Sequence, residues 1–81
     1  MNVKTLKIIG KRVGLNGCLL DCYVEFMKIR FPTEKAKNYC QEWAIRIKAG
    51  YAYNVADAQS KKALMEAVKK SGISLKELCA R

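Results

Sequence analysis

The sequence predicts an all-α fold, a small bundle of four to five helices around a central apolar helix at about residues 18–31, closed by a C-terminal helical hairpin. Apolar residues recur at spacings of three and four along most of the chain, which is the period of one side of a helix. Glycines and the single proline separate these stretches. The chain therefore divides into short helices joined by tight turns.

Length and composition limit the chain to one small helical domain, residues 1–81. Eighty-one residues are too few for two hydrophobic cores, since domains typically span about 50–250 residues. Hydrophobic residues make up 51% of the chain and charged residues 28%, a balance typical of globular proteins. A core this small must either pack efficiently or be completed by a partner subunit.

Residues 3–13 are compatible with two local structures. Leu6–Ile9 could form a short strand, and Gly10 weakens either assignment. Lysines at spacings i, i+3 and i+7 favour a helix, because that spacing places all three on one side. We expect a basic amphipathic helix with Lys4, Lys7 and Lys11 on one side and Val3, Leu6 and Val13 on the other.

The central segment at residues 18–31 is the most apolar part of the chain and has no net charge. Its apolar side chains form two stripes, so this helix must be covered on two sides. Asn16 could cap its start, and Pro32 ends it because the residue before proline avoids the helical region. One stripe is Leu20, Val24, Met27 and Phe31, the other is Cys22, Phe26 and Ile29, and the polar strip is Asp21, Glu25 and Lys28.

A further helix is expected from Glu34 to Ala49, with Thr33 as its N-cap and Gly50 at its C-terminus. Ile45 lies outside the apolar stripe of this helix. It is either a lone apolar residue on the surface or part of an interface. The stripe is Ala36, Cys40, Trp43 and Ile47, and the outer side carries Glu42 and Arg46 at the spacing of an ion pair.

The next segment, Gly50–Asn54, is predicted to be a linker. A helix capped at position 54 or 57 then runs to about residue 71, where Gly72 ends it. Ser74 and Glu77 have the spacing of a capping box, which opens a last short helix. The inner side of the longer helix carries Leu64, Ala67 and Val68, and its outer side carries Lys62, Glu66 and Lys69.

The C-terminal stretch Leu64–Arg81 combines a helix with apolar inner residues, a turn at Gly72 and Ile73, a capping serine and a second helix. This order resembles the helix-turn-helix unit of DNA-binding proteins. The resemblance implies that the second helix, with Leu75, Lys76 and Arg81, enters the major groove. Ser71 departs from that pattern, since an apolar residue usually precedes the turn glycine. A plain helical hairpin that closes a bundle would have the same glycine and capping serine.

The formal net charge of +9 favours a polyanionic partner. The excess positive charge lies outside the central helix, and lysine predominates over arginine, which suits phosphate neutralisation better than bidentate base recognition. We predict a nucleic-acid-binding protein, for DNA rather than RNA, of the kind that phages and mobile elements use as regulators. The candidate contacts are Lys4, Lys7, Lys11, Arg12, Lys62, Lys69, Lys70, Lys76 and Arg81.

Two further interpretations stay open. Tyr51 and Tyr53 could stack bases, although tyrosines in a short linker more often pack their rings on the core. The protein could instead be an inhibitor or adaptor that binds an acidic protein, or a second copy of itself, through the surplus apolar surface of the central helix.

Catalysis has little support in the sequence, which lacks histidine, a glycine-rich phosphate loop and a nucleophile elbow. The spacing of the four cysteines, at positions 18, 22, 40 and 79, fits neither a zinc site nor a disulfide framework. Asp21 and Glu25 share their strip with Lys28, so a solvated strip explains this carboxylate pair. We expect no enzymatic activity, no cofactor, no metal and no small-molecule substrate.

A membrane-spanning helix is not expected either. Asp21, Glu25, Lys28 and Arg30 interrupt the most apolar stretch, which falls short of the roughly 18–20 apolar residues that span a bilayer. We therefore expect a cytoplasmic protein with no membrane partner.

Overall fold

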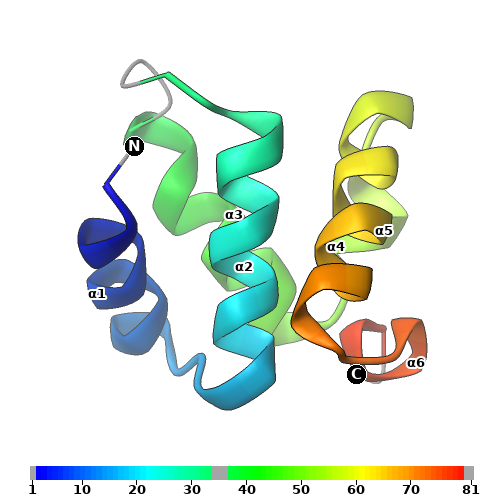
Figure 1. Cartoon of the computed structure of the whole chain (residues 1–81), viewed down its shortest axis with the longest axis horizontal. Coiled ribbons are helices and arrows are strands. Elements are labelled where there is room, and N and C mark those ends of the chain that lie inside the picture. Colours follow the sequence, from blue (N-terminus) through cyan, green and yellow to red (C-terminus); the bar gives the residue numbers. More distant parts are fainter. Residues whose placement is uncertain (1, 34–36, 80–81) are drawn as a thin grey trace.

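A computed structural model, which describes residues 2–33 and 37–79, confirms the all-α class. No strand occurs in the described ranges, so the helical alternative for residues 3–13 is the correct one. Two of the helices, α4 and α6, are single turns. In chain order the helices are α1 (Val3–Val13), α2 (Gly17–Arg30), α3 (Lys37–Ala49), α4 (Ala52–Val55), α5 (Ala58–Ser71) and α6 (Leu75–Leu78) (Figure 1).

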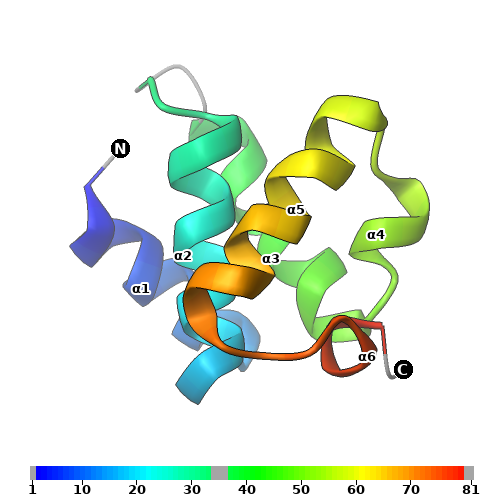
Figure 2. The same ribbon diagram turned by 45° about the vertical axis from the view of Figure 1, so that its right-hand side comes forward.

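Helix α2 is the predicted central helix, and α1 and α5 lie on its two flanks (Figures 1 and 2). Helix α3 also contacts it, through the rings of Phe26 and Trp43. Both apolar stripes are covered, except that Ile29 and Phe31 are only partly buried. Leu6 of α1 is fully buried, so α1 completes the cover that α3 and α5 begin.

Tyr23 is also buried, although it belongs to neither predicted stripe. Its hydroxyl donates a 2.8 Å hydrogen bond to the backbone carbonyl of Cys40. That bond satisfies the buried phenol and ties α2 to α3.

Gly10 permits the close approach of α1 to α2. A Cβ atom at this position would lie 2.5 Å from Cδ1 of Leu20, nearer than two carbon atoms can pack. The glycine that weakened the helix prediction is therefore a packing position within the helix. Gly14 then ends α1 with a φ of 105°, a conformation that favours glycine.

The turns follow the predicted capping chemistry, with two differences. The Asp57 side chain accepts from the Ser60 backbone N–H, and the Ser74 hydroxyl accepts from that of Glu77. Asn16 stands at the N-cap of α2, but its side chain makes no capping hydrogen bond. The one-turn helix α4 begins inside the predicted linker, and its Ala52 is fully buried. The predicted start of the third long helix, residues 34–36, lies outside the described residues.

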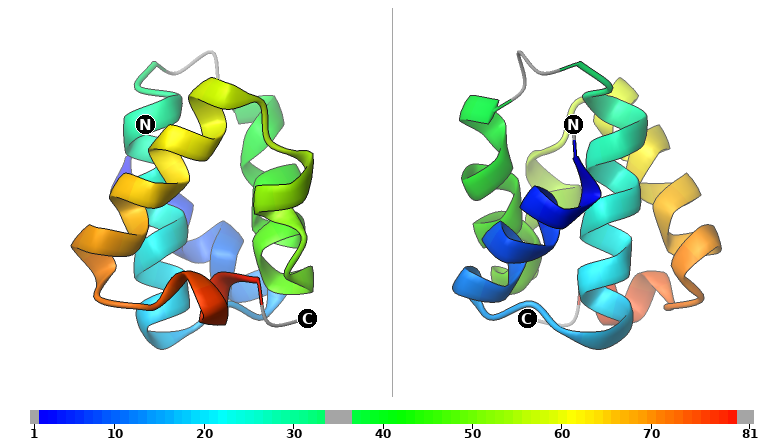
Figure 3. Two further views of the ribbon diagram at one scale, coloured as in Figure 1. Left: turned by 90° about the vertical axis from the view of Figure 1, so that its right-hand side faces the viewer. Right: turned by 60° about the vertical axis from the view of Figure 1, so that its left-hand side comes forward.

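Helices α2 and α5 run antiparallel. The end of α2 meets the start of α5, where Nε of Arg30 donates a hydrogen bond to the Ser60 hydroxyl, and Cys22 near the start of α2 lies beside Ser71 at the end of α5. Helix α6 lies across the end of the bundle that also holds the α1–α2 turn (Figures 1 and 3). In the described ranges, no helix has both the length and the apolar character needed to cross a bilayer.

Candidate nucleic-acid interface

The predicted phosphate contacts lie on α1, α5 and α6, and each of those that the structure describes is exposed. None of the ion pairs among the described residues engages any of them. Their charges are therefore available to an anionic ligand. Arg81 lies outside the described residues. The described contacts are Lys4, Lys7, Lys11 and Arg12 on α1, Lys62, Lys69 and Lys70 on α5, and Lys76 on α6.

Tertiary packing brings Lys7 of α1 and Lys70 of α5 to one hollow of about 270 Å³, which we call the first hollow. The polar strip of α2 lies between these two lysines. Within that strip, Nζ of Lys28 lies 3.5 Å from Oε1 of Glu25. The lining of the first hollow is Val3, Lys7, Asp21, Val24, Glu25, Lys28, Lys70 and Ser71.

The first hollow carries only a small positive excess, because three lysines face two carboxylates. The polar strip lies between the lysines of α1 and those of α5. The sequence did not predict this position. The phosphates of a nucleic acid would thus be attracted by the lysines on both sides of α2 and repelled by Asp21 between them.

A second hollow, of about 250 Å³, follows further along the contact between α2 and α5. It is lined by Lys62 and Glu66 of α5 and by Ile29 and Arg30 of α2, with Gln59 and Ala63 beside them. We call the surface around the first and second hollows the lysine face. Its hollows are lined by Lys7, Lys28, Lys62 and Lys70, together with Arg30. By helical spacing, Lys4 and Lys11 lie on the same side of α1 as Lys7, and Lys69 on the same side of α5 as Lys62.

Two predicted contacts lie apart from the lysine face. Arg12 lines a separate hollow between α1 and α3, together with Ile9, Val13 and Gln41. Lys76 lies on α6 at the end of the bundle (Figure 3). The predicted cations therefore do not form one continuous patch.

The resemblance of α5 and α6 to a helix-turn-helix extends to the turn, where Gly72 has a φ of 79° and Ile73 is buried. The second helix, α6, differs from the second helix of a helix-turn-helix unit, because less of it is exposed. Leu78 is buried and Leu75 is partly buried against the core, which leaves Lys76 as the exposed cation of the described reading helix. Helix α6 thus serves to close the end of the core.

A further hollow, of about 530 Å³, was not found by sequence reasoning, and we call it the aromatic hollow. Four elements contribute to it: the end of α2, α3, α4 and the start of α5. No spacing in the sequence connects residues from four elements, so no signal in the sequence marked the site. Its lining residues are Arg30, Phe31, Tyr39, Glu42, Trp43, Arg46, Val55, Asp57 and Ser60.

Stacked rings form one wall of the aromatic hollow. Phe31 and Tyr39 are nearly parallel, with ring centroids 5.1 Å apart and an interplanar angle of 11°. Trp43 lies beneath them, 6.5 Å from Phe31 and 4.7 Å from the buried ring of Phe26. Tyr39 itself is 46% exposed, so the stack continues from the core to the surface.

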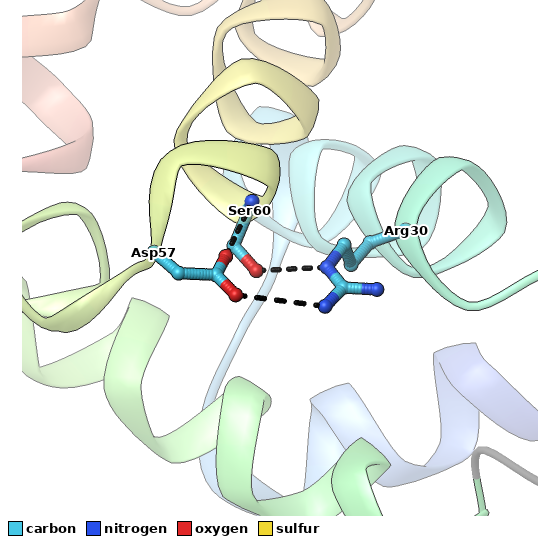
Figure 4. Close-up of polar contacts among 3 residues, drawn as sticks. All are labelled: Arg30, Asp57 and Ser60. Atoms are coloured by element: carbon cyan, nitrogen blue, oxygen red, sulfur yellow. Dashed lines mark hydrogen bonds and ion pairs between the residues drawn. The ribbon is translucent and has the colours of Figure 1, made fainter.

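Both arginines of the aromatic hollow are held by carboxylates. Nε of Arg30 donates a 2.9 Å hydrogen bond to the Ser60 hydroxyl, and a terminal nitrogen of Arg30 lies 3.7 Å from Oδ2 of Asp57 (Figure 4). Arg46 forms the predicted ion pair with Glu42. The four charges of the lining therefore sum to zero.

Both guanidinium groups also lie over rings, Arg30 at 4.7 Å from the Phe31 centroid and Arg46 at 4.9 Å from that of Trp43. The Ser60 backbone N–H, the Ser60 hydroxyl and Arg30 together lower the pKa of Asp57. Asp57 is thus held in the ionised form that Arg30 needs as a partner.

The tyrosines of the predicted linker differ from each other. Tyr53 is partly buried against the core, and Nζ of Lys61 lies 5.3 Å from its ring centroid. Tyr51 is 41% exposed. Tyr53 thus packs its ring on the core, as tyrosines in a short linker usually do, and Tyr51 does not.

None of the four cysteines, all of which lie in the described residues, forms a disulfide bond, and Cys18 is the exposed one. Burial raises the pKa of Cys22 to about 11 and also raises the pKa of Cys40. Both thiols stay protonated at neutral pH, which makes them poor nucleophiles and poor metal ligands. Within residues 2–33 and 37–79, no three Cys, Asp or Glu side chains lie close enough together to hold a metal ion.

Comparison with known protein families, with curated proteins and with solved structures found no match to this chain.

Proposed function

We propose that this protein binds nucleic acid by neutralising its phosphates with the lysine face. The observation that carries this proposal is the exposure of lysines on α1 and α5 that no carboxylate engages. Free ammonium groups release counterions from a nucleic-acid backbone, which is the main source of sequence-independent affinity. DNA rather than RNA is the expected ligand, because α5 and α6 resemble the DNA-binding helix-turn-helix.

The proposed mode is contact with the backbone and not reading of bases. Lysine is a point charge that binds phosphate without the bidentate geometry that base recognition requires. Helix α6 presents few side chains to a groove, since Leu75 and Leu78 face the core. Binding is therefore expected to vary little with sequence. A cytoplasmic location belongs to this proposal, since cysteines without disulfide bonds suit a reducing compartment.

Salt dependence tests the proposal directly. Binding to a short duplex of mixed sequence is measured by fluorescence anisotropy at about 50 mM and about 200 mM salt. If four lysines contact phosphates, affinity falls about a hundredfold between these concentrations. Absence of binding at the lower salt concentration would overturn the proposal.

Charge reversal locates the interface. One variant replaces Lys4, Lys7 and Lys11 with Glu, and the other replaces Lys62, Lys69 and Lys76. Comparable losses in both support one face that uses α1 and α5, whereas a loss confined to the second supports a helix-turn-helix mode. Lys61→Glu is the matched control, because Lys61 lies on α5 over Tyr53 and outside the lysine face.

A second candidate function is that of an inhibitor or adaptor that binds a protein, including a second copy of this chain. It is favoured by half-exposed apolar side chains on several helices, namely Ile8, Tyr39, Ile45 and Val55. A complex with an acidic protein that persists at high salt, recovered from host lysate, would support it. A homodimer would be detected by light scattering of the purified protein.

A further inference from the structure

We propose that the aromatic hollow holds one unpaired base of a single-stranded nucleic acid whose phosphates lie on the lysine face. This inference rests on the proposed function and adds a ligand class, the unstacked nucleobase, and a second site. Three properties of the hollow support it: an exposed ring stack, balanced charge and a position next to the second hollow.

The ring stack offers a surface to a flat heteroaromatic ligand. Phe31 supports Tyr39 from one side at 5.1 Å, and Tyr39 is 46% exposed. Bases stack on exposed aromatic rings of proteins with little dependence on sequence. The hollow, at about 530 Å³, falls within the range of roughly 300–1,000 Å³ that is common for ligand sites.

Charge balance favours a base over an anion. Arg30 is paired with Asp57, and Arg46 with Glu42. A phosphate or a carboxylate in this hollow would meet both acidic side chains at close range, with no uncompensated cation to hold it. A base is uncharged, and its edge carries both donors and acceptors, which arginine N–H groups and carboxylate oxygens can match.

The position of the hollow connects it to the lysine face. Arg30 lines both the second hollow and the aromatic hollow, and Lys62 lies in the second. A strand whose phosphates follow the contact between α2 and α5 therefore reaches the aromatic hollow at Arg30. A base inside a duplex is covered on both faces by its neighbours and cannot enter without being extruded.

Trp43 supplies a direct signal, because it is the only tryptophan of the chain and lines the hollow. The full-length protein is titrated at low salt with a single-stranded oligonucleotide of mixed sequence and, separately, with the same strand annealed to its complement. The single strand is expected to quench Trp43 emission. The duplex is expected to bind, as anisotropy shows, without quenching.

Tyr39→Ala removes the outer ring of the stack without changing charge. It should weaken single-strand binding about tenfold, which corresponds to the loss of one stacked base, and should leave duplex binding within twofold. Tyr39→Phe should behave like the parent protein. Tyr51→Ala is the matched control, since Tyr51 is 41% exposed but does not line the hollow. Circular dichroism and thermal melting confirm that each variant is folded.

The outcomes separate the two proposals. If single strand and duplex bind equally and Tyr39→Ala has no effect, the base site is wrong while the proposed function stands. If neither ligand binds at low salt, both are overturned. A protein captured by the parent chain and lost with Tyr39→Ala, without nucleic-acid binding, would assign the hollow to a protein partner and also overturn both.

Discussion

The lysine face and the aromatic hollow use cations in opposite ways. On the lysine face, Lys28 is paired with Glu25, and the other lysines have no carboxylate partner within ion-pair distance in the described residues. In the aromatic hollow, both arginines are paired and lie over rings. The two regions thus differ in where the fold places its acidic side chains, which the net charge of the chain does not reveal.

Helix α2 takes part in both regions. Its polar strip, with Asp21, lines the first hollow, and its last residue, Arg30, lines the aromatic hollow together with Phe31, which follows the helix. The segment has no net charge in sequence, yet it places a carboxylate among the lysines and a cation among the rings. Substitutions in and around α2 should therefore distinguish the role of the lysine face from that of the aromatic hollow.

The largest effect is expected at the base of the aromatic hollow. Phe26 is fully buried against Trp43 and Phe31. Phe26→Ala should lower the free energy of unfolding by about 3–5 kcal/mol, measured by guanidinium denaturation. Phe26→Asp should destabilise further, because it buries an unpaired charge. If Phe26→Asp stays folded and changes oligomeric state instead, this side of α2 is an interface.

The next effect concerns the lysine face. Gly10→Ala forces a Cβ atom against Leu20 and should cost about 1–3 kcal/mol of stability. It also moves α1 away from α2, so duplex binding through Lys7 should weaken. Thr5→Ala is the control on the same helix, since Thr5 is exposed. Equal stability of the two variants would contradict the close contact between α1 and α2.

A pH titration examines the packing beneath the lysine face, where Cys22 is fully buried. The pKa of Cys22 is raised from 9.0 to about 11 in the folded state. The Cys22 thiol ionises at a lower pH in the unfolded state than in the folded state. Its contribution to the free energy of unfolding is therefore complete below about pH 9 and is lost as pH rises towards 11. The loss is at most about 1.4 kcal/mol for each pH unit. Cys22→Ala should show a shallower decline in thermal melts over this interval, and an identical slope would contradict the assignment.

The smallest effect is expected when a paired arginine of the aromatic hollow loses its carboxylate partner. Glu42→Gln should release Arg46 and add one positive charge to the aromatic hollow. Stability should change by less than about 1 kcal/mol, as for other partly exposed ion pairs, while nucleic-acid affinity at low salt rises about twofold to threefold. Glu66→Gln makes the same charge change beside Lys62 in the second hollow. A gain from Glu66→Gln alone would restrict binding to the lysine face.

Several features of the fold were predictable from local patterns. Apolar spacing and turn residues predicted the long helices, and Ser74 was predicted as a cap, Asp57 as one of two candidate caps and Glu42 with Arg46 as an ion pair. Each of these depends on residues within one turn of each other. The burial of Tyr23 and the one-turn helix α4 escaped prediction, because both depend on packing against distant segments.

The sequence alone determined which side of each helix is apolar and that the chain carries a large positive charge. Only the tertiary structure decided that Lys7 lies across α2 from Lys70 and that Arg30 meets Asp57. Helical spacing specifies neighbours along one helix, whereas the pairing and direction of helices depend on how complete side chains fit together. The candidate sites are made of contacts between helices. The sequence could therefore propose individual lysines as phosphate contacts, but it indicated neither their grouping nor the aromatic hollow.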